Sequence, residues 1–331
     1  MGGIRKLRKI QLGVEETAGT NVAATTVWRG TGTIQDDIEV TSRNEDVGYL
    51  SEVDNSYVPT TLATLELEPT EATFEQLPYI LNMGNESEAG AKDGAGNGYV
   101  YTHDLATTAQ KTPLTYSFEG GDDQGQEEFS YGFCSEFSIT GAARKSLMMG
   151  ATIQGRQVAP TSFTGAIAVP TVEEILFGKG ILAIDAIGGT FGATVKSNTL
   201  LGMALNVKTG HVPLFAANGQ IYFALTQQIA PEVSLDITFV HDASAAAQIV
   251  AYRAQTPQKL QVRFNGSAVT QGTAYNSKAL IINLAGRWTK FTKIDEQDGG
   301  DVVTGTFRAR YNATATSFAS IIVVNALSAL T

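Results

Sequence analysis

The sequence predicts a mostly β protein, and two observations carry that prediction. Short alternating or apolar segments, bounded by Gly, Asn, Asp and Thr, recur from about residue 30 onward. Only two segments show helical character. The chain has 331 residues, which corresponds to about two domains at roughly 150 residues each. A β chain of this length can bury a substantial core.

Five segments alternate clearly enough to be predicted as strands: 61–67, 114–119, 233–239, 260–264 and 302–311. In the last of these, one face carries Val303, Phe307, Ala309 and Tyr311, and the solvent face carries Thr304, Thr306, Arg308 and Arg310. The unbroken apolar run 321–324 is typical of a strand covered on both faces.

Each of the two predicted helices directly follows a strand. Thr70 is the expected N-cap of a helix over 71–83, which Pro78 should kink or restart. Asp242 is the expected N-cap of an Ala-rich helix that starts at residue 243 and ends before Pro257.

An ungapped alignment of the chain with itself, at an offset of 172 in residue number, suggests an internal duplication. It places the apolar residues Ala63, Leu65 and Leu67 on Leu235, Ile237 and Phe239. It also places the polar residues Thr64 and Glu66 on Asp236 and Thr238, and Thr70 on Asp242. We therefore predict a first repeat over 1–160, with a long Gly-rich loop over 84–104, and a second repeat over 161–331.

Composition and charge exclude several classes of function. The formal net charge is -10, so the chain lacks the positive charge with which proteins grip nucleic acid phosphates. The single cysteine, Cys134, excludes an intramolecular disulfide and a multi-Cys zinc site. No apolar run approaches the ~18 residues of a membrane span, so no membrane insertion is expected.

No catalytic constellation is evident, and we expect no enzyme activity, cofactor or metal. His103, His211 and His241 are far apart in sequence, and we interpret them as surface or turn residues. Cys134 alternates with aromatic residues and is expected in the core. Two acidic segments, 120–128 and 295–301, lack calcium-loop spacing and are expected at hairpin tips.

Three stretches of the chain resemble the major tail tube protein of long-tailed, siphovirus-like bacteriophages. TLATLELEPTEATFEQLPYILNMG resembles the strand and helix of the first tube fold, and FSITGAARKSLMMGATIQGRQVAPTSFTGA the strands that close it. DGGDVVTGTFRARYNATATSFASIIVVNAL resembles the terminal strand pair. These motifs are patterns of apolar alternation and small residues, and their specificity is moderate.

The resemblance implies a tail-tube-type β-sandwich or barrel with a flanking helix, in rings that stack into a hollow tube. It implies a virion tail location after assembly in the bacterial host cytoplasm. The expected partners are further copies of the chain and the tape-measure, tail terminator and distal tail proteins, while DNA passes through the lumen without specific binding. The ring count stays open between a trimer with pseudo-sixfold symmetry, which the duplication favours, and a hexamer.

Two sets of residues are expected to serve such a tube. The polar strand residues Thr64, Glu66, Asp236 and Thr238 are expected to line the lumen. The contacts between rings are expected from a basic N-terminal segment and the 84–104 loop, through Arg5, Lys6, Arg8, Lys9, Gly84, Asn85 and Asp93. A solvated terminus is an equal alternative for the basic segment.

The alternatives come from other classes of protein. A carbohydrate-binding or adhesive β-sandwich module of a virion or cell surface would need clustered exposed aromatic residues, whereas Trp28 and Trp288 are isolated in the sequence. A β-rich hydrolase would need a carboxylate pair with perturbed pKa values, and the sequence selects no such pair.

Overall fold

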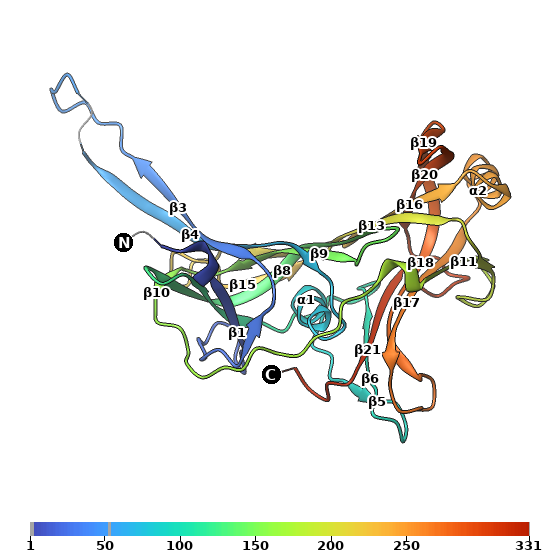
Figure 1. Ribbon diagram of the computed structural model, residues 1–331. Coiled ribbons are helices and arrows are strands. Elements are labelled where there is room, and N and C mark those ends of the chain that lie inside the picture. Colours follow the sequence, from blue (N-terminus) through green and yellow to red (C-terminus); the bar gives the residue numbers. More distant parts are fainter. Residues whose placement is uncertain (1–2, 52–53, 331) are drawn as a thin grey trace.

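The computed structural model describes residues 3–51 and 54–330, and it confirms the mostly β class. Antiparallel strands dominate this part of the chain, and its two α-helices are α1 (Leu77–Gly84) and α2 (Ala243–Arg253). Figure 1 shows a sheet that crosses the molecule, with α1 beneath it and α2 beyond its right-hand end.

The first half of the chain forms a connected set of antiparallel strands. Its strands are β1 (Lys9–Val14), β2 (Thr26–Trp28), β3 (Gly32–Ser42), β4 (Ser56–Glu71), β7 (Tyr116–Gly121), β8 (Gln126–Ala142), β9 (Met148–Gly155) and β10 (Ala159–Pro160). β1 pairs with β2 and β7, β7 with β8, and β8 with both β9 and β10. β9 then pairs with β4, and β4 with β3.

The strands of the second half pair in the same order. They are β11 (Gly180–Ala186), β12 (Val195–Lys196), β13 (Leu200–Lys208), β16 (Glu232–Val240), β17 (Gln258–Ala268), β18 (Ser277–Phe291), β20 (Gly300–Ala309) and β21 (Ala319–Asn325). β11 pairs with β12 and β17, β17 with β18, and β18 with both β20 and β21. β20 then pairs with β16, and β16 with β13.

β8 and β18 carry a β-bulge at the same place. The bulge falls at Ser135 in β8 and at Thr289 in β18. The Ser135 hydroxyl donates to the backbone oxygen of Thr152 on β9 at 3.1 Å, and the Thr289 hydroxyl donates to that of Thr306 on β20 at 3.2 Å. The two donor residues differ by 154 in residue number, and so do the two acceptor residues.

The strand register differs from the sequence alignment by two positions. Leu65 lies opposite Ile153, and Leu235 lies opposite Phe307. Because Ile153 and Phe307 differ by 154 in residue number, as do the bulges, the register matches Leu65 with Leu235 at an offset of 170 rather than 172. A shift of two positions keeps every side chain on the same face of a strand.

The two halves join through a direct strand pair. Residues 202–208 of β13 pair with residues 136–142 of β8. This pairing creates one continuous run in the order β3, β4, β9, β8, β13, β16, β20 and β18. The buried faces of these strands and α1 belong to the same hydrophobic core.

The start of α1 corrects the prediction of Thr70 as a cap. Thr70 lies within β4, which continues to Glu71 opposite Met148. The helix starts at Leu77, and the backbone N–H of Gln76 donates to the hydroxyl of Thr73 at 3.2 Å. Pro78 lies in the first turn, where its missing N–H leaves no bond unmade, so it starts the helix instead of kinking it.

The start of α2 confirms the prediction. Asp242 has an extended backbone, and its carboxylate accepts from the backbone N–H of Ala245 at 2.9 Å. The helix ends at Arg253, before Pro257. Its Gln248 side chain lies within 3.3 Å of the indole nitrogen of Trp288, so α2 packs on the buried face of the sheet.

The expected loop over 84–104 is only partly a loop. It contains β5 (Ala91–Lys92) and β6 (Tyr99–Asp104), and β6 pairs with β21 of the second half. The Tyr101 ring is fully buried, and its hydroxyl donates to the backbone oxygen of Leu327 at 2.8 Å. This segment therefore joins the first half to the sheet of the second.

Candidate functional site: the polar sheet face and its free edges

The four residues expected to line a lumen lie on one face of the long sheet. Thr64 and Glu66 on β4, and Asp236 and Thr238 on β16, are half-buried or exposed. Their neighbours along the strands, such as Leu65 and Leu235, are fully buried. This face points away from the core, and we call it the polar face.

Hydrogen bonds between neighbouring strands order the polar face in both halves. The Thr64 hydroxyl donates to Asp37 on β3 at 2.6 Å. In the second half, the Thr306 hydroxyl donates to Asp236 at 2.5 Å. The hydroxyls of Thr238 and Thr304 lie 3.0 Å apart. Short hydroxyl-bearing side chains therefore hold the carboxylates of this face close to the sheet surface.

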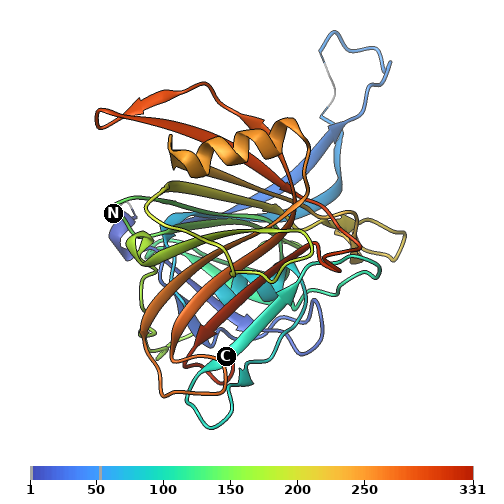
Figure 2. The same ribbon diagram turned by 90° about the vertical axis from the view of Figure 1, so that its right-hand side faces the viewer.

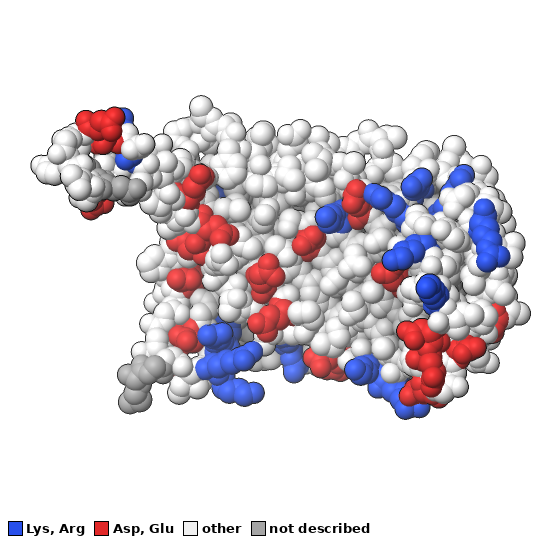
Figure 3. Space-filling model, turned by 90° about the horizontal axis from the view of Figure 1, so that it is seen from above, with Lys and Arg blue, Asp and Glu red and all other residues white. Residues whose placement is uncertain are grey.

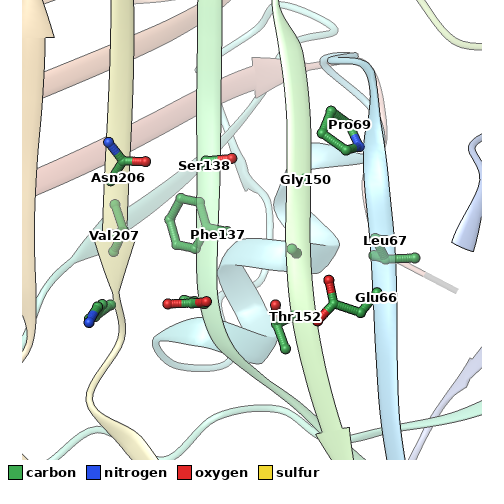
Figure 4. A pocket seen from close by; sticks show the side chains of 12 residues that line it. Glu66, Leu67, Pro69, Phe137, Ser138, Gly150, Thr152, Asn206 and Val207 are labelled. Atoms are coloured by element: carbon green, nitrogen blue, oxygen red, sulfur yellow. The ribbon is translucent and has the colours of Figure 1, made fainter. Parts of the chain in front are cut away.

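The polar face contains a shallow groove of about 440 Å³ over β4, β9, β8 and β13. Figure 4 shows Glu66, Thr152, Phe137 and Asn206 along it. Its lining combines small residues such as Gly150 and Ser138 with the larger side chains of Phe137 and Lys208. The groove crosses the strand pair β8–β13, where the two halves of the chain meet.

Charges of both signs are spread over the polar face. Figure 3 shows Asp and Glu over its left and middle parts and more Lys and Arg toward the right. The Arg308 guanidinium contacts Glu232 at 2.9 Å, and both side chains are about half exposed, so this pair adds little stability. Because carboxylates cover the left and middle parts, the face is not a continuous phosphate-binding stripe.

The two ends of the long sheet have unpaired edges. Within the described residues, β3 forms backbone pairs with β4 alone, so its other edge is open. β18 pairs with β17 only as far as Gly286. Beyond that residue β18 pairs with β20 on one side, and among the described residues its other side forms no strand pair. Figure 1 shows these edges at opposite ends of the molecule. Open edges expose unmade backbone hydrogen bonds and invite pairing with another strand.

The basic segment, residues 5–9, is folded against the chain near the start of β3. It forms a 3-10 helix over Arg5–Leu7 and the first residue of β1. Arg5, Lys6 and Arg8 are exposed, whereas Lys9 lies over the Phe163 ring at 4.1 Å. Arg5 and Arg8 line a small depression together with Gly32. Three cations are therefore exposed beside the open edge of β3.

Gly84, Asn85 and Asp93, expected in contacts between rings, are buried by this chain. A side chain at Gly84 would meet Thr209 at 2.9 Å. Asn85 donates to the backbone oxygen of Asp104 at 3.1 Å. The Asp93 carboxylate accepts backbone N–H groups of residues 273–275 at 2.7 to 3.1 Å. All three residues therefore hold the chain's own fold together, and their expected contact between rings stays a prediction.

The interpretation of His103 and His211 as surface residues is wrong. His103 lies on β6 and is fully buried, and His211 starts β14 (His211–Leu214) with 2% of its surface exposed. Burial lowers the pKa of His103 to about 3 and that of His211 to about 4, so both rings are neutral near pH 7.

Cys134 and the acidic turns lie where the sequence predicted. Cys134 is fully buried on β8, and burial raises the pKa of its thiol. The acidic segment 120–128 forms the turn between β7 and β8, and 295–301 forms the hairpin of β19 (Asp295–Gln297) with β20. In the part of the chain that the structure describes, no cluster of three metal-ligating side chains occurs.

Two segments that connect equivalent strands of the two halves were not predicted from the sequence. Residues 209–231 link β13 to β16 and fold onto the first half; we call them the docked segment. Residues 38–51 and 54–61 form the end of the β3–β4 pair and project from the molecule at the left of Figure 1; we call them the projecting hairpin. The exposed apolar residues at and near its tip, Val47, Tyr49 and Leu50, were the available signal.

No protein-family model matches the chain, and no curated protein is significantly similar to it. Neither described α-helix has the length and apolar character that a membrane crossing requires. The features of this chain that bear on its function are therefore the polar face and the open edges of its sheet.

Proposed function

We propose that this chain is a structural subunit that assembles with copies of itself into rings, and that the rings stack into the hollow tail tube of a bacteriophage. The observation that carries this proposal is the single sheet with open edges at its opposite ends. Adding a copy at one edge leaves the same edge open at the far side, so addition continues until the ring closes.

The internal duplication is part of the proposal. It is supported by the identical pairing order of the two sets of strands and by the equivalent bulges at Ser135 and Thr289. Each repeat would contribute one tube domain, with boundaries near 1–160 and 161–331. Two domains per chain favour a trimer with pseudo-sixfold symmetry over a hexamer.

The polar face is proposed as the lumen surface. Both helices pack on the opposite, buried side of the sheet, so this face is the one left open to water. Its mixed charges, together with the net charge of -10, favour passage of DNA without tight binding. In this proposal the protein performs no catalytic step.

Electron microscopy of the purified chain over a concentration series tests this function. The expected result is rings or hollow tubes in negative stain, with end-on averages that show the central channel, and the mass of the ring divided by the mass of the chain gives the number of subunits. A monodisperse monomer at all concentrations, with or without preformed tail-tip complexes as initiators, would contradict the proposal. A glycan array would then test the carbohydrate-binding alternative.

A further inference from the structure

We infer that the junction between the two halves of this chain is repeated between copies, with the end of β18 from one copy paired antiparallel to β3 of the next. The inference rests on the proposed self-assembly and adds the residues and the register of the contact. It follows from a junction that the structure already contains, the pairing of β8 with β13.

The internal junction determines the register. Residues of β18 and β20 follow their equivalents in β8 and β9 by 154 positions, as the bulges show. Residues of β13 follow those of β3 by 171, because Ile34 lies opposite Leu65 and Leu205 lies opposite Leu235. In the internal junction Ser138 lies opposite Asn206. The same pairing between copies places Thr292 opposite Gln35.

Charge complementarity supports this register. In the internal junction the exposed Glu136 lies directly opposite the exposed Lys208. The equivalent pair between copies is Lys290 opposite Asp37, so the opposite charges remain although their order is reversed. Like charges directly opposite each other would oppose the pairing, and this register brings none together over 31–37.

The contacts of the segment that precedes the first strand of each half give a second, independent match to the internal junction. Within the chain, the β8–β9 hairpin binds the segment before β11: Phe177 N–H donates to the Lys145 oxygen at 3.1 Å, and Leu147 N–H donates to the Ile175 oxygen at 2.7 Å. Between copies, the equivalent hairpin is the acidic segment 295–301 of one copy. The equivalent of the segment that it binds is the basic segment, 5–9, of the next copy.

The charges of these two segments are opposite and balanced. The hairpin carries four carboxylates, Asp295, Glu296, Asp298 and Asp301, and the segment carries four cations, Arg5, Lys6, Arg8 and Lys9. Figure 1 shows the dark blue segment 5–9 and the β19–β20 hairpin at opposite ends of the molecule, and Figure 2 shows both at the left of the view, as a head-to-tail contact requires. The basic segment is thereby assigned to the neighbour within a ring, in place of the contact between rings expected from the sequence.

Disulfide trapping tests the register. Directly opposite residues of antiparallel strands have Cα atoms about 4.5 to 5.5 Å apart, which a disulfide can span. Thr292→Cys and Gln35→Cys in one chain should therefore give reducible covalent oligomers under mild oxidation. An equal mixture of the two single variants should give a covalent dimer. The wild-type chain is the control for Cys134, which is fully buried.

A matched control distinguishes this register from loose contact. Thr292→Cys combined with Glu39→Cys keeps the second cysteine on β3 but moves it about four residues, or about 13 Å, along the strand. This pair should link at least tenfold less than the pair with Gln35→Cys. Equal or greater linking through Glu39→Cys, or rings that assemble without linking at 292 and 35, would overturn the junction and leave the proposed function intact. Wild-type chains that never assemble would overturn both.

Exchanging the charges tests the same junction without oxidation. Lys290→Glu places a carboxylate opposite Asp37. It should weaken association, measured by sedimentation, about two- to fivefold at each junction, which is the range of effects that exposed ion pairs have. Adding Asp37→Lys should restore association. Continued weakness of the double variant, despite an unchanged unfolding midpoint of the isolated chain, would count against the pairing.

Discussion

The docked segment and the projecting hairpin occupy equivalent places but have different surroundings. The docked segment, 209–231, and the projecting hairpin, 38–51 and 54–61, are nearly equal in length. The first folds onto β8: Thr209 N–H donates to the Ser135 oxygen at 3.0 Å, and Phe223 is fully buried. The second has no equivalent half beside it: Tyr49 is 77% exposed, and Leu50 is completely exposed.

This difference indicates that a neighbouring half decides the conformation of such a segment. Arg156 holds the docked segment by donating to the backbone oxygens of Phe223 and Ala224 at 3.3 and 2.7 Å, while its guanidinium lies over the Tyr131 ring. Its equivalent in the second half, Arg310, is exposed. In an assembled ring, the projecting hairpin of the next copy would reach the surface around Arg310.

The largest expected effect tests the equivalence of β4 and β16, whose buried faces belong to the same core. Leu65→Asp and Leu235→Asp each place a charge without a partner at a fully buried position, which costs several kcal/mol. Both variants should unfold at much lower urea concentration or fail to fold, as followed by Trp fluorescence. Glu66→Gln, on the polar face, should change stability by less than about 0.5 kcal/mol. A stable Leu65→Asp or Leu235→Asp chain would contradict the assignment of the strand faces.

Acid should separate the two buried histidines from the exposed His241. The pKa values of His103 and His211 are lowered in the folded chain to about 3 and about 4, against about 6.5 unfolded, so protonation favours the unfolded state. The part of the free energy of unfolding that comes from the neutral rings is complete above about pH 6.5. It is lost as the pH falls toward 4, at about 1.4 kcal/mol per pH unit for each histidine. Urea midpoints at pH 7.5 and 5.0 measure this loss.

Variants assign the acid effect to particular residues. Neither ring nitrogen of His103 has a hydrogen-bond partner among the described residues, so His103→Leu should remove about half of the stability loss between pH 7.5 and 5.0. His241→Leu should leave that loss unchanged, because His241 is exposed. An undiminished pH dependence in His103→Leu would refute the role of its burial.

What the sequence predicted and what it missed follow from the range of the interactions. Alternation along 61–67 and 233–239 predicted the buried faces, and the Asp242 cap predicted α2, because these signals are local. Thr70 was misassigned because its pairing partner, Met149, lies far along the chain in β9. β6 resembled a loop because its partner, β21, lies near the other end of the chain.

The same reasoning explains why the strand register and the sequence alignment differ by two positions. Strand faces repeat every two residues, so offsets of 170 and 172 place the same side chains in the core. Only the cross-strand register, which pairs Leu65 with Ile153 and Leu235 with Phe307, distinguishes them. The polar face was therefore predictable from the sequence, whereas the open edges were not, because an edge is defined by pairs that are absent.

A moderate effect is expected from removing the arginine that distinguishes the docked segment. Arg156→Ala leaves the Phe223 and Ala224 oxygens without their donor and should cost about 1–3 kcal/mol, with faster hydrogen exchange over 209–231. Arg310→Ala should change the isolated chain by less than about 0.5 kcal/mol, because that side chain is exposed. Equal losses in the two variants would contradict the comparison.

The smallest effect concerns the helix caps, where the two halves differ in chemistry. Asp242→Ala removes an N-cap carboxylate and should cost about 1 kcal/mol. At α1, Thr73→Ala removes the hydroxyl that accepts from Gln76, but every residue of that helix is buried. Tertiary packing rather than capping should therefore dominate the stability of α1.

The measurement is the urea midpoint of each alanine variant, with hydrogen exchange over 77–84 and 243–253. Asp242→Ala should increase exchange mainly in α2, which is half exposed and depends more on its ends. Asp242→Asn, which keeps an accepting side-chain oxygen, should retain most of the stability. If Asp242→Asn is as destabilised as Asp242→Ala, the carboxylate acts through its charge near the helix N-terminus rather than through its hydrogen bond to Ala245.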